Sequence, residues 1–116
     1  MMILLILNDP PYGSERCYNA LRLTNTLLKE EPVPEVTVFL MADSVACAKA
    51  SQKTPDGYYN LECMLKGIVR KATLLLCGTC MDARGIAEDE LLAGARRSTM
   101  AELAELTFAA DKVLVF

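Results

Sequence analysis

Two cysteines separated by two residues, Cys77 and Cys80, are the residues of this sequence best suited to chemistry. They lie in the segment "LLLCGTCMDARG", directly after a run of leucines, in a chain of 116 residues that contains no histidine. Thiolates bind metal ions, exchange disulfides and carry sulfane sulfur. The segment therefore allows a metal site, a dithiol redox site or a single working cysteine.

A metal site within one chain is not expected. Structural zinc needs four ligands, usually as two closely spaced pairs. The other cysteines, Cys17, Cys47 and Cys63, stand singly, and no histidine can complete a ligand set. We therefore expect no metal and no other cofactor, although a site shared between subunits stays open. A Cys-His hydrolase would also lack its base.

Reversible oxidation of the pair is chemically feasible, because Cys77 and Cys80 can approach each other across one helical turn. In the third interpretation, Cys77 alone carries the chemistry. It lies at a strand end, where backbone N–H groups of the next turn can stabilise its thiolate. Such a thiolate can attack a sulfane sulfur and hold it as a persulfide, which Cys80 could resolve or receive. Arg84 could add positive charge if the turn folds back, whereas Asp82 could equally be a solvated helix residue.

Free cysteines are often only packing residues. We expect this of Cys17, Cys47 and Cys63, since each falls in or near the apolar face of a predicted helix. Cys77 and Cys80 differ, because they flank a glycine at a strand end.

The loop "NDPPYGSE" is the second candidate segment, with Tyr12 and Gly13 at its centre. A loop with glycine before a helix N-terminus can hold an anion. The loop lacks the glycine spacing and lysine of a phosphate-binding loop, and Tyr12 can instead pack against a neighbouring loop or subunit. The candidate site residues are thus Cys77 and Cys80 for catalysis and, for substrate binding, the set Tyr12, Gly13, Asp82 and Arg84.

Hydrophobic periodicity predicts the elements that position these residues. Apolar runs predict strands over 2–7, 36–41, 72–77 and 112–116, and the alternation of strands with helices requires another over the short, charged segment 94–97, which ends in the basic pair Arg96 and Arg97. Helices are predicted from Ser14 to about residue 28, then over 43–50, 60–68, 79–83, 88–93 and 99–110, with Ser14, Asn60 and Thr99 as N-caps. The polar segment 51–60 is predicted to be the longest loop.

Strands that alternate with helices and read as apolar runs indicate a mainly parallel sheet covered on both faces. The prediction is one domain over residues 1–116, a three-layer α/β/α sandwich with about five strands. The carboxyl ends of parallel strands form one rim, where ligands bind in such folds. The segments "NDPPYGS", "ADS" and "CGTCMDARG" should lie along that rim, whatever the strand order.

Composition excludes several classes of protein. The net charge is −3, and the basic residues cluster only in pairs, so a nucleic-acid surface is not expected. The apolar N-terminal run is too short for a membrane span and lacks the features of a signal peptide. Five cysteines, an odd number, indicate reduced thiols. These observations predict a cytoplasmic protein without membrane contact.

The segments "PYGSE", "NALRLTNTLL", "VFLMADSV", "LLCGTCMDARGI" and "STMAELAELTFAADKVLVF" together resemble the DsrE/DsrF-like family, and within it the YchN-like branch. The resemblance covers essentially the whole chain. It implies an α/β/α sandwich that assembles into trimers or hexamers. In sulfur-relay members a cysteine eight residues before the "RG" glycine carries persulfide sulfur, and Cys77 stands eight residues before Gly85. Cys80 departs from the relay subunits and follows the YchN-like branch.

Residues and resemblance together predict a small sulfur carrier, or sulfurtransferase-like protein, that holds sulfur on Cys77. The alternatives are a non-enzymatic oligomeric module that binds a ligand or partner, and a dithiol redox protein. The expected partners are copies of the same chain, as a homotrimer or homohexamer, and sulfur donor and acceptor proteins that the sequence does not name.

Overall fold

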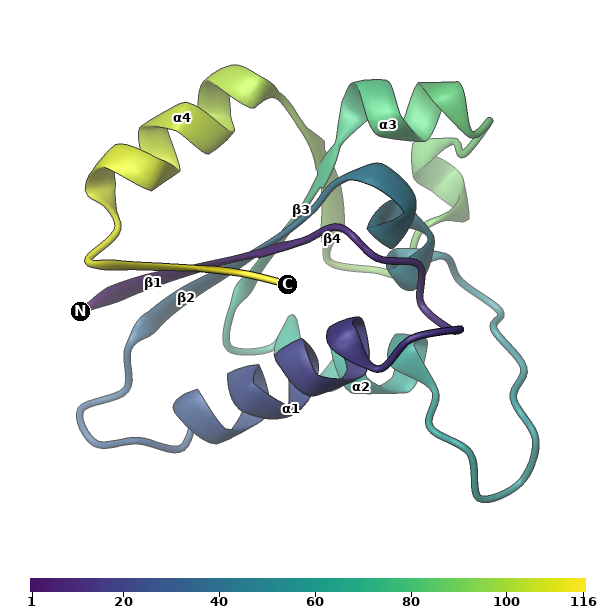
Figure 1. Ribbon diagram of the computed structural model, residues 1–116, viewed down its shortest axis with the longest axis horizontal. Helices are drawn as coiled ribbons and strands as arrows, with labels where there is room; N and C mark the ends of the chain where they lie inside the picture. Colours follow the sequence, from purple (N-terminus) through teal and green to yellow (C-terminus); the bar gives the residue numbers. More distant parts are fainter.

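The computed structural model describes all 116 residues and is built on one sheet of five strands in the order β4-β3-β2-β1-β5 (Figure 1). Every neighbouring pair of strands is parallel. The strands are β1 Met2–Leu7, β2 Glu35–Leu40, β3 Thr73–Cys77, β4 Ala95–Ser98 and β5 Lys112–Val115. The predicted parallel five-stranded sheet is confirmed.

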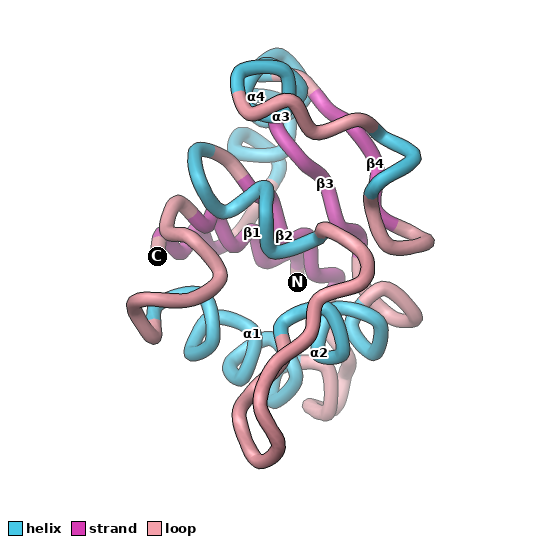
Figure 2. The backbone as a smooth tube through the Cα atoms, turned by 90° about the vertical axis from the view of Figure 1, so that its right-hand side faces the viewer, coloured by secondary structure: helices cyan, strands magenta, loops and turns pink.

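Helices on both faces complete the sandwich. The α-helices are α1 Arg16–Leu27, α2 Leu61–Ile68, α3 Gly78–Ala83 and α4 Met100–Ala109, and two 3₁₀-helices are η1 Ala42–Ala48 and η2 Glu88–Glu90. Figures 1 and 2 show α1 and α2 on one side of the sheet and α4 on the other. None of these helices is both long and apolar enough to cross a membrane.

The two faces of the sheet bury very different amounts of apolar surface. The face under α1 and α2 holds a cluster of 22 buried residues, whereas the α4 face holds only five, namely Leu4, Phe39, Leu75, Cys77 and Leu103. Side chains alternate between faces along a strand, so Leu74 and Leu76 point to the large cluster while Leu75 and Cys77 point to the small one. Cys77 therefore faces the thinly covered side.

Two of the three predicted N-caps are confirmed. The side chain of Asn60 accepts a hydrogen bond from the backbone N–H of Cys63 at 3.1 Å. The hydroxyl of Thr99 accepts one from the N–H of Glu102, also at 3.1 Å. Each bond satisfies an N–H group that has no partner within its helix.

The third predicted cap is wrong by one residue. Helix α1 begins after Glu15, which makes no side-chain cap bond. The Ser14 hydroxyl instead donates to a carboxylate oxygen of Asp9 at 2.7 Å. The Ser14 oxygen also accepts a long hydrogen bond of 3.4 Å from the backbone N–H of Arg16, the first residue of α1, so it still contacts the helix start from one residue before the cap.

The predicted helix over 88–93 is also wrong. Only the single turn η2 forms, and the chain then pairs with the end of η1 through an antiparallel bridge between Lys49 and Leu91. The backbone N–H of Leu92 donates to the carbonyl of Ala48 at 2.9 Å. Both Leu91 and Leu92 are buried, and the extended backbone lets these consecutive apolar residues pack on different neighbours.

Candidate functional site

Cys77 lies where β3 ends and α3 begins, as its N-cap residue. Its Sγ is 3.2 Å from the hydroxyl oxygen of Thr79. It lines a pocket of about 150 Å³ whose full lining is Cys77, Gly78, Thr79, Arg97, Ser98, Thr99 and Met100. The parallel register pairs Cys77 with Ser98, and for this reason the end of β4 forms the opposite wall.

Hydrogen bonds favour the thiolate form of Cys77. Burial raises the pKa of the thiol, but hydrogen bonds from the Thr79 hydroxyl, the Cys80 thiol and the backbone N–H groups of both residues outweigh burial and lower the pKa below its ordinary value. A larger fraction of Cys77 is therefore nucleophilic at neutral pH than for a free cysteine.

Cys80 has the opposite tendency. Its Sγ accepts a hydrogen bond from the backbone N–H of Ala42 at 3.2 Å. Burial raises the pKa of Cys80, and its hydrogen bond to Cys77 raises it further. The bond from Ala42 opposes these effects without outweighing them, so the pKa of Cys80 is raised while that of Cys77 is lowered, and the two cysteines are chemically unequal.

Asp82 does not stand free in solvent but binds Arg97. Two hydrogen bonds of 2.7 Å each join the Arg97 guanidinium to the two carboxylate oxygens of Asp82. The guanidinium crosses Gly78, where a Cβ would stand 2.6 Å from Arg97 Nε. The absence of a side chain at Gly78 is what lets this cation lie beside Cys77.

Arg97 was not among the residues singled out from the sequence. It appeared there only as half of a basic pair at the end of a short, charged strand. Arg97 could have been identified only from the strand order, because β4 must lie beside β3 for Arg97 to reach Cys77. That adjacency appears only in the folded sheet.

Arg84 does not line the Cys77 pocket. Its Nε donates to a carboxylate oxygen of Asp43 at 2.9 Å, and a second guanidinium nitrogen donates to the carbonyl of Cys80 at 3.1 Å. Arg84 therefore ties α3 to η1, the segment that follows β2. The prediction that "ADS" and "CGTCMDARG" share one rim is confirmed by this pair and by the contact between Ala42 and Cys80.

Tyr12 and Gly13 do not join the Cys77 pocket. The Tyr12 hydroxyl donates to the side chain of Gln52 at 2.6 Å and accepts from the N–H of Leu61 at 3.3 Å. Its ring belongs to a cluster with Tyr18, Tyr58 and Tyr59. Gly13 has a φ of 102°, which only glycine adopts readily, so its structural requirement is the turn before α1.

The remaining cysteines divide into two kinds. Cys17 and Cys47 are fully buried in the larger core, as predicted. Cys63 is exposed, so its predicted packing role is wrong. It lies on the solvent side of α2, whose buried residues are Leu61, Glu62, Leu65 and Ile68.

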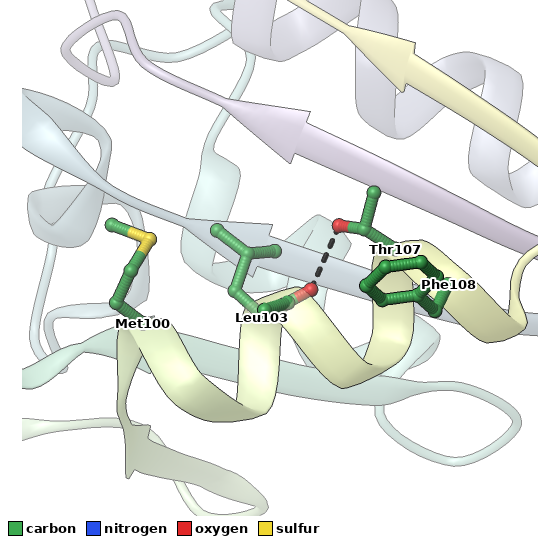
Figure 3. A pocket seen from close by; sticks show the side chains of 5 residues that line it. Met100, Leu103, Thr107 and Phe108 are labelled. Carbon is green, nitrogen blue, oxygen red and sulfur yellow. Dashed lines mark hydrogen bonds between the residues drawn. The ribbon is translucent and has the colours of Figure 1, made fainter.

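A larger, apolar groove of about 530 Å³ lies along α4 (Figure 3). Its lining is Met100, Leu103, Ala104, Thr107 and Phe108. None of these residues ionises or acts as a nucleophile, so the groove offers contact surface rather than chemistry. Met100 also lines the Cys77 pocket and connects the two.

No three Cys, Asp or Glu side chains gather closely enough to hold a metal ion, and no residue is assigned as a metal ligand.

Comparison with known sequences gives consistent matches along the entire chain. Residues 1–116 match the DsrE/DsrF-like family. Protein YchN of Escherichia coli K12 is 40% identical over 115 residues, which cover 98% of this chain and 97% of YchN. The uncharacterized protein MJ0989 of Methanocaldococcus jannaschii is 36% identical over 116 residues, all of both chains.

Comparison with solved structures supports the fold. The crystal structure of the E. coli ychN protein superposes with a TM-score of 0.95 at 39% identity and covers 100% of this chain and 99% of that one. MTH1491 of Methanobacterium thermoautotrophicum, a protein of unknown function, gives a TM-score of 0.79 at 12% identity over 99% of this chain and 97% of its own. The second likeness concerns the fold alone.

Proposed function

This chain belongs to the DsrE/DsrF-like family, and on that premise we propose that it is a small sulfur carrier that accepts sulfane sulfur on Cys77. The observation that supports the proposal most directly is the set of hydrogen bonds that lower the pKa of Cys77 where it lines a pocket. A carrier needs a nucleophilic thiolate at neutral pH and an opening through which a donor reaches it.

The loading step exchanges one sulfur–sulfur bond for another. The Cys77 thiolate attacks the outer sulfur of a donor persulfide R–S–S⁻, a bond forms between Sγ and that sulfur, and R–S⁻ leaves with the electron pair of the broken bond. The product is a Cys77 persulfide. No external oxidant or reductant is consumed, and delivery to an acceptor thiolate reverses the step.

In this proposal Cys80 assists Cys77. The raised pKa of Cys80 favours a protonated S–H group that can donate to Cys77, and Cys80 is among the causes that lower the pKa of Cys77. The same donor can stabilise the negative outer sulfur of the persulfide. Cys80 therefore supports the carrier thiol and need not become oxidised during loading.

Mass spectrometry of the loaded protein tests the proposal. The reduced protein is incubated with glutathione persulfide, excess donor is removed, and intact mass and peptide maps are recorded. We expect one added sulfur, 32 Da, on the peptide that contains Cys77. Cys77→Ser should lose it, while Cys63→Ser, which removes the exposed thiol, should retain it. Added sulfur on Cys63 but not on Cys77 would contradict the proposal.

A dithiol redox protein is the second candidate, because Cys77 and Cys80 lie one turn apart and each shifts the pKa of the other. Oxidation would join the two sulfurs and pass two electrons and two protons to a disulfide acceptor. If no thiol accepts sulfur while the protein loses 2 Da through a Cys77–Cys80 bond, this function replaces the first. If Cys77 also resists alkylation in the folded protein, a non-catalytic binding module becomes the better description.

We further propose that the chain works as a homotrimer or homohexamer and exchanges sulfur with donor and acceptor proteins. Support comes from the α4 face, where Phe108 is 94% exposed beside a groove of about 530 Å³. Exposed aromatic surface of this kind is commonly buried in an assembly. Reduced thiols are needed for the proposed chemistry, so we propose that the protein acts in the cytoplasm.

A further inference from the structure

The Cys77 pocket has a single charged side chain in its wall. Of its seven lining residues only Arg97 is charged, and the others are apolar, hydroxyl-bearing or glycine. A cation beside a thiolate nucleophile has two effects, since it stabilises the thiolate and attracts an anionic reactant. The second effect concerns the identity of the donor.

The position of Arg97 is built into the fold. The guanidinium lies across Gly78, so close that a Cβ there would stand 2.6 Å from Nε and 2.9 Å from one terminal nitrogen. Asp82 holds the two terminal nitrogens at 2.7 Å each. Nε, the atom nearest Gly78, donates no hydrogen bond to the protein and remains available to an incoming group.

The ion pair with Asp82 does not prevent the Arg97 guanidinium from attracting an anion. Both side chains are open to solvent, with 43% of Arg97 and 63% of Asp82 exposed. Water and salt screen such pairs strongly. An anion that enters the pocket can therefore share the guanidinium with Asp82.

We infer that Arg97 makes the Cys77 pocket selective for small anionic sulfane donors, in which the transferable sulfur is bonded directly to an oxyanion group as in thiosulfate. This inference rests on the proposed sulfur-carrier function. The pocket of about 150 Å³ offers the volume of roughly five water molecules. Thiosulfate has about that many non-hydrogen atoms and can enter whole, whereas a tripeptide persulfide such as glutathione persulfide can place only its terminal sulfurs in the pocket.

The transfer balances without a further reactant. The Cys77 thiolate attacks the outer sulfur of S–SO₃²⁻, the Sγ–S bond forms, and sulfite, SO₃²⁻, leaves with the electron pair of the broken S–S bond. The outer sulfur becomes the terminal atom of the Cys77 persulfide. Arg97 stabilises the oxyanion group of the donor, on which negative charge remains as sulfite departs.

Alkylation tests the selectivity without any sulfur transfer. Iodoacetate and iodoacetamide have similar size but differ by one negative charge. Their rates at Cys77 are measured by peptide mass spectrometry, and their ratio is divided by the same ratio at the exposed Cys63. A change in the pKa of Cys77 affects both reagents equally and cancels in the ratio.

We expect Arg97→Gln to lower the iodoacetate preference about fivefold, the factor for one pair of charges about 4 Å apart in water. Gly78→Ala should lower it as well, because the new Cβ displaces the guanidinium while the total charge stays the same. The matched control is Arg96→Gln, which removes the neighbouring cation from a comparable pair with Glu102. An equal ratio in wild type, Arg97→Gln and Arg96→Gln would overturn the inference.

Loading with two donors separates this inference from the proposed function. Thiosulfate and glutathione persulfide are each offered to the wild type and to Arg97→Gln. We expect the thiosulfate rate, relative to the persulfide rate, to fall about tenfold or more in the variant, because both charges of thiosulfate would lie in the pocket beside Arg97, whereas the carboxylates of glutathione persulfide would stay outside it. If only glutathione persulfide loads Cys77, and Arg97→Gln does not change the alkylation ratio, the sulfur-carrier function stands and the inference of an anionic donor is refuted. If neither donor loads Cys77, the carrier function fails together with the thiosulfate donor, and the alkylation ratio then reports only whether the pocket prefers anions.

Discussion

The backbone N–H of Ala42 donates a hydrogen bond to Sγ of Cys80 at 3.2 Å, whereas Sγ of Cys77 lies 3.2 Å from the Thr79 hydroxyl, so the two cysteines of the CxxC segment have different partners. Ala42 immediately follows the loop residue after β2, while Cys80 lies on α3, so the bond joins two strand ends. The Ala42 bond alone would lower the pKa of Cys80, but burial and Cys77 outweigh it and raise that pKa, opposite to the shift at Cys77. A symmetric dithiol would need both sulfurs in equivalent surroundings, and the surroundings of Cys77 and Cys80 differ.

The Thr79 hydroxyl should control the pH dependence of Cys77. In the wild type the pKa of Cys77 lies below the ordinary value of 9.0, with burial opposed by hydrogen bonds from Thr79 and Cys80. Thr79→Val removes the hydroxyl donor, so the pKa should rise and the pH–rate profile of iodoacetamide alkylation should move to higher pH. Thr107→Val is the control, since that hydroxyl donates to the carbonyl of Leu103 on α4. Coinciding profiles for wild type and Thr79→Val would show that Thr79 does not stabilise the thiolate.

Asp82→Asn should change selectivity without changing stability. The ion pair between Asp82 and Arg97 is exposed, and such pairs contribute little to folding. Loss of the carboxylate leaves the charge of Arg97 uncompensated, and the iodoacetate preference at Cys77 should rise about twofold to fivefold. The midpoint of urea unfolding should stay within error of the wild type. A marked loss of stability with no gain in preference would instead assign the pair a structural role.

Glu62 should make folding stability depend on pH. This carboxylate is buried and accepts the backbone N–H groups of Ser51 and Gln52 at 3.1 and 2.9 Å, which hold the start of the loop 51–60. Burial raises the pKa of Glu62, but these bonds and Lys66 outweigh burial and lower it below 4.5. A depressed folded-state pKa contributes stability above pH 4.5, and that stability is lost as pH falls through the folded value.

Urea unfolding of Glu62→Gln checks this expectation. At pH 7 the variant should lose about 1–3 kcal/mol of unfolding free energy, because two N–H groups lose a charged acceptor. The difference from the wild type should shrink as the pH falls below 4.5, since Glu62 itself becomes protonated there. Glu30→Gln, in an exposed turn, provides the control. A difference that stays constant with pH would exclude the charge as its cause.

The three central strands could be predicted from local patterns because each buries most of a continuous apolar run. The apolar runs at β1, β2 and β3 and the Asn60 and Thr99 caps are local signals, and the structure confirms them. The helix predicted over 88–93 was wrong, because the tertiary pairing of this segment with the end of η1 overrides a weak helical pattern.

The candidate site could be predicted only in part, for a related reason. Cys77 and Cys80 are close in sequence and on one turn, so their spacing was informative. Arg97 reaches Cys77 only because β4 lies beside β3, and the pattern of apolar residues does not encode strand order. The sequence predicted Tyr12 and Gly13 on the same rim of the sheet as Cys77. The Tyr12 side chain instead turns toward Gln52 and the loop 51–60.

The exposed side of α4 should mediate the proposed self-association. Phe108 is 94% exposed and lines the apolar groove on this helix (Figure 3). Phe108→Lys places a cation in the last turn of α4, where the helix dipole tolerates it, so the fold should persist while contact between copies is lost. Sedimentation velocity should then show a trimer or hexamer for the wild type and a smaller species for the variant. Val33→Lys, at a position 54% exposed in the turn before β2, introduces the same charge elsewhere and should leave the assembly intact. A wild type that sediments as a monomer, or equal effects of the two substitutions, would show that the α4 face does not join copies of this chain.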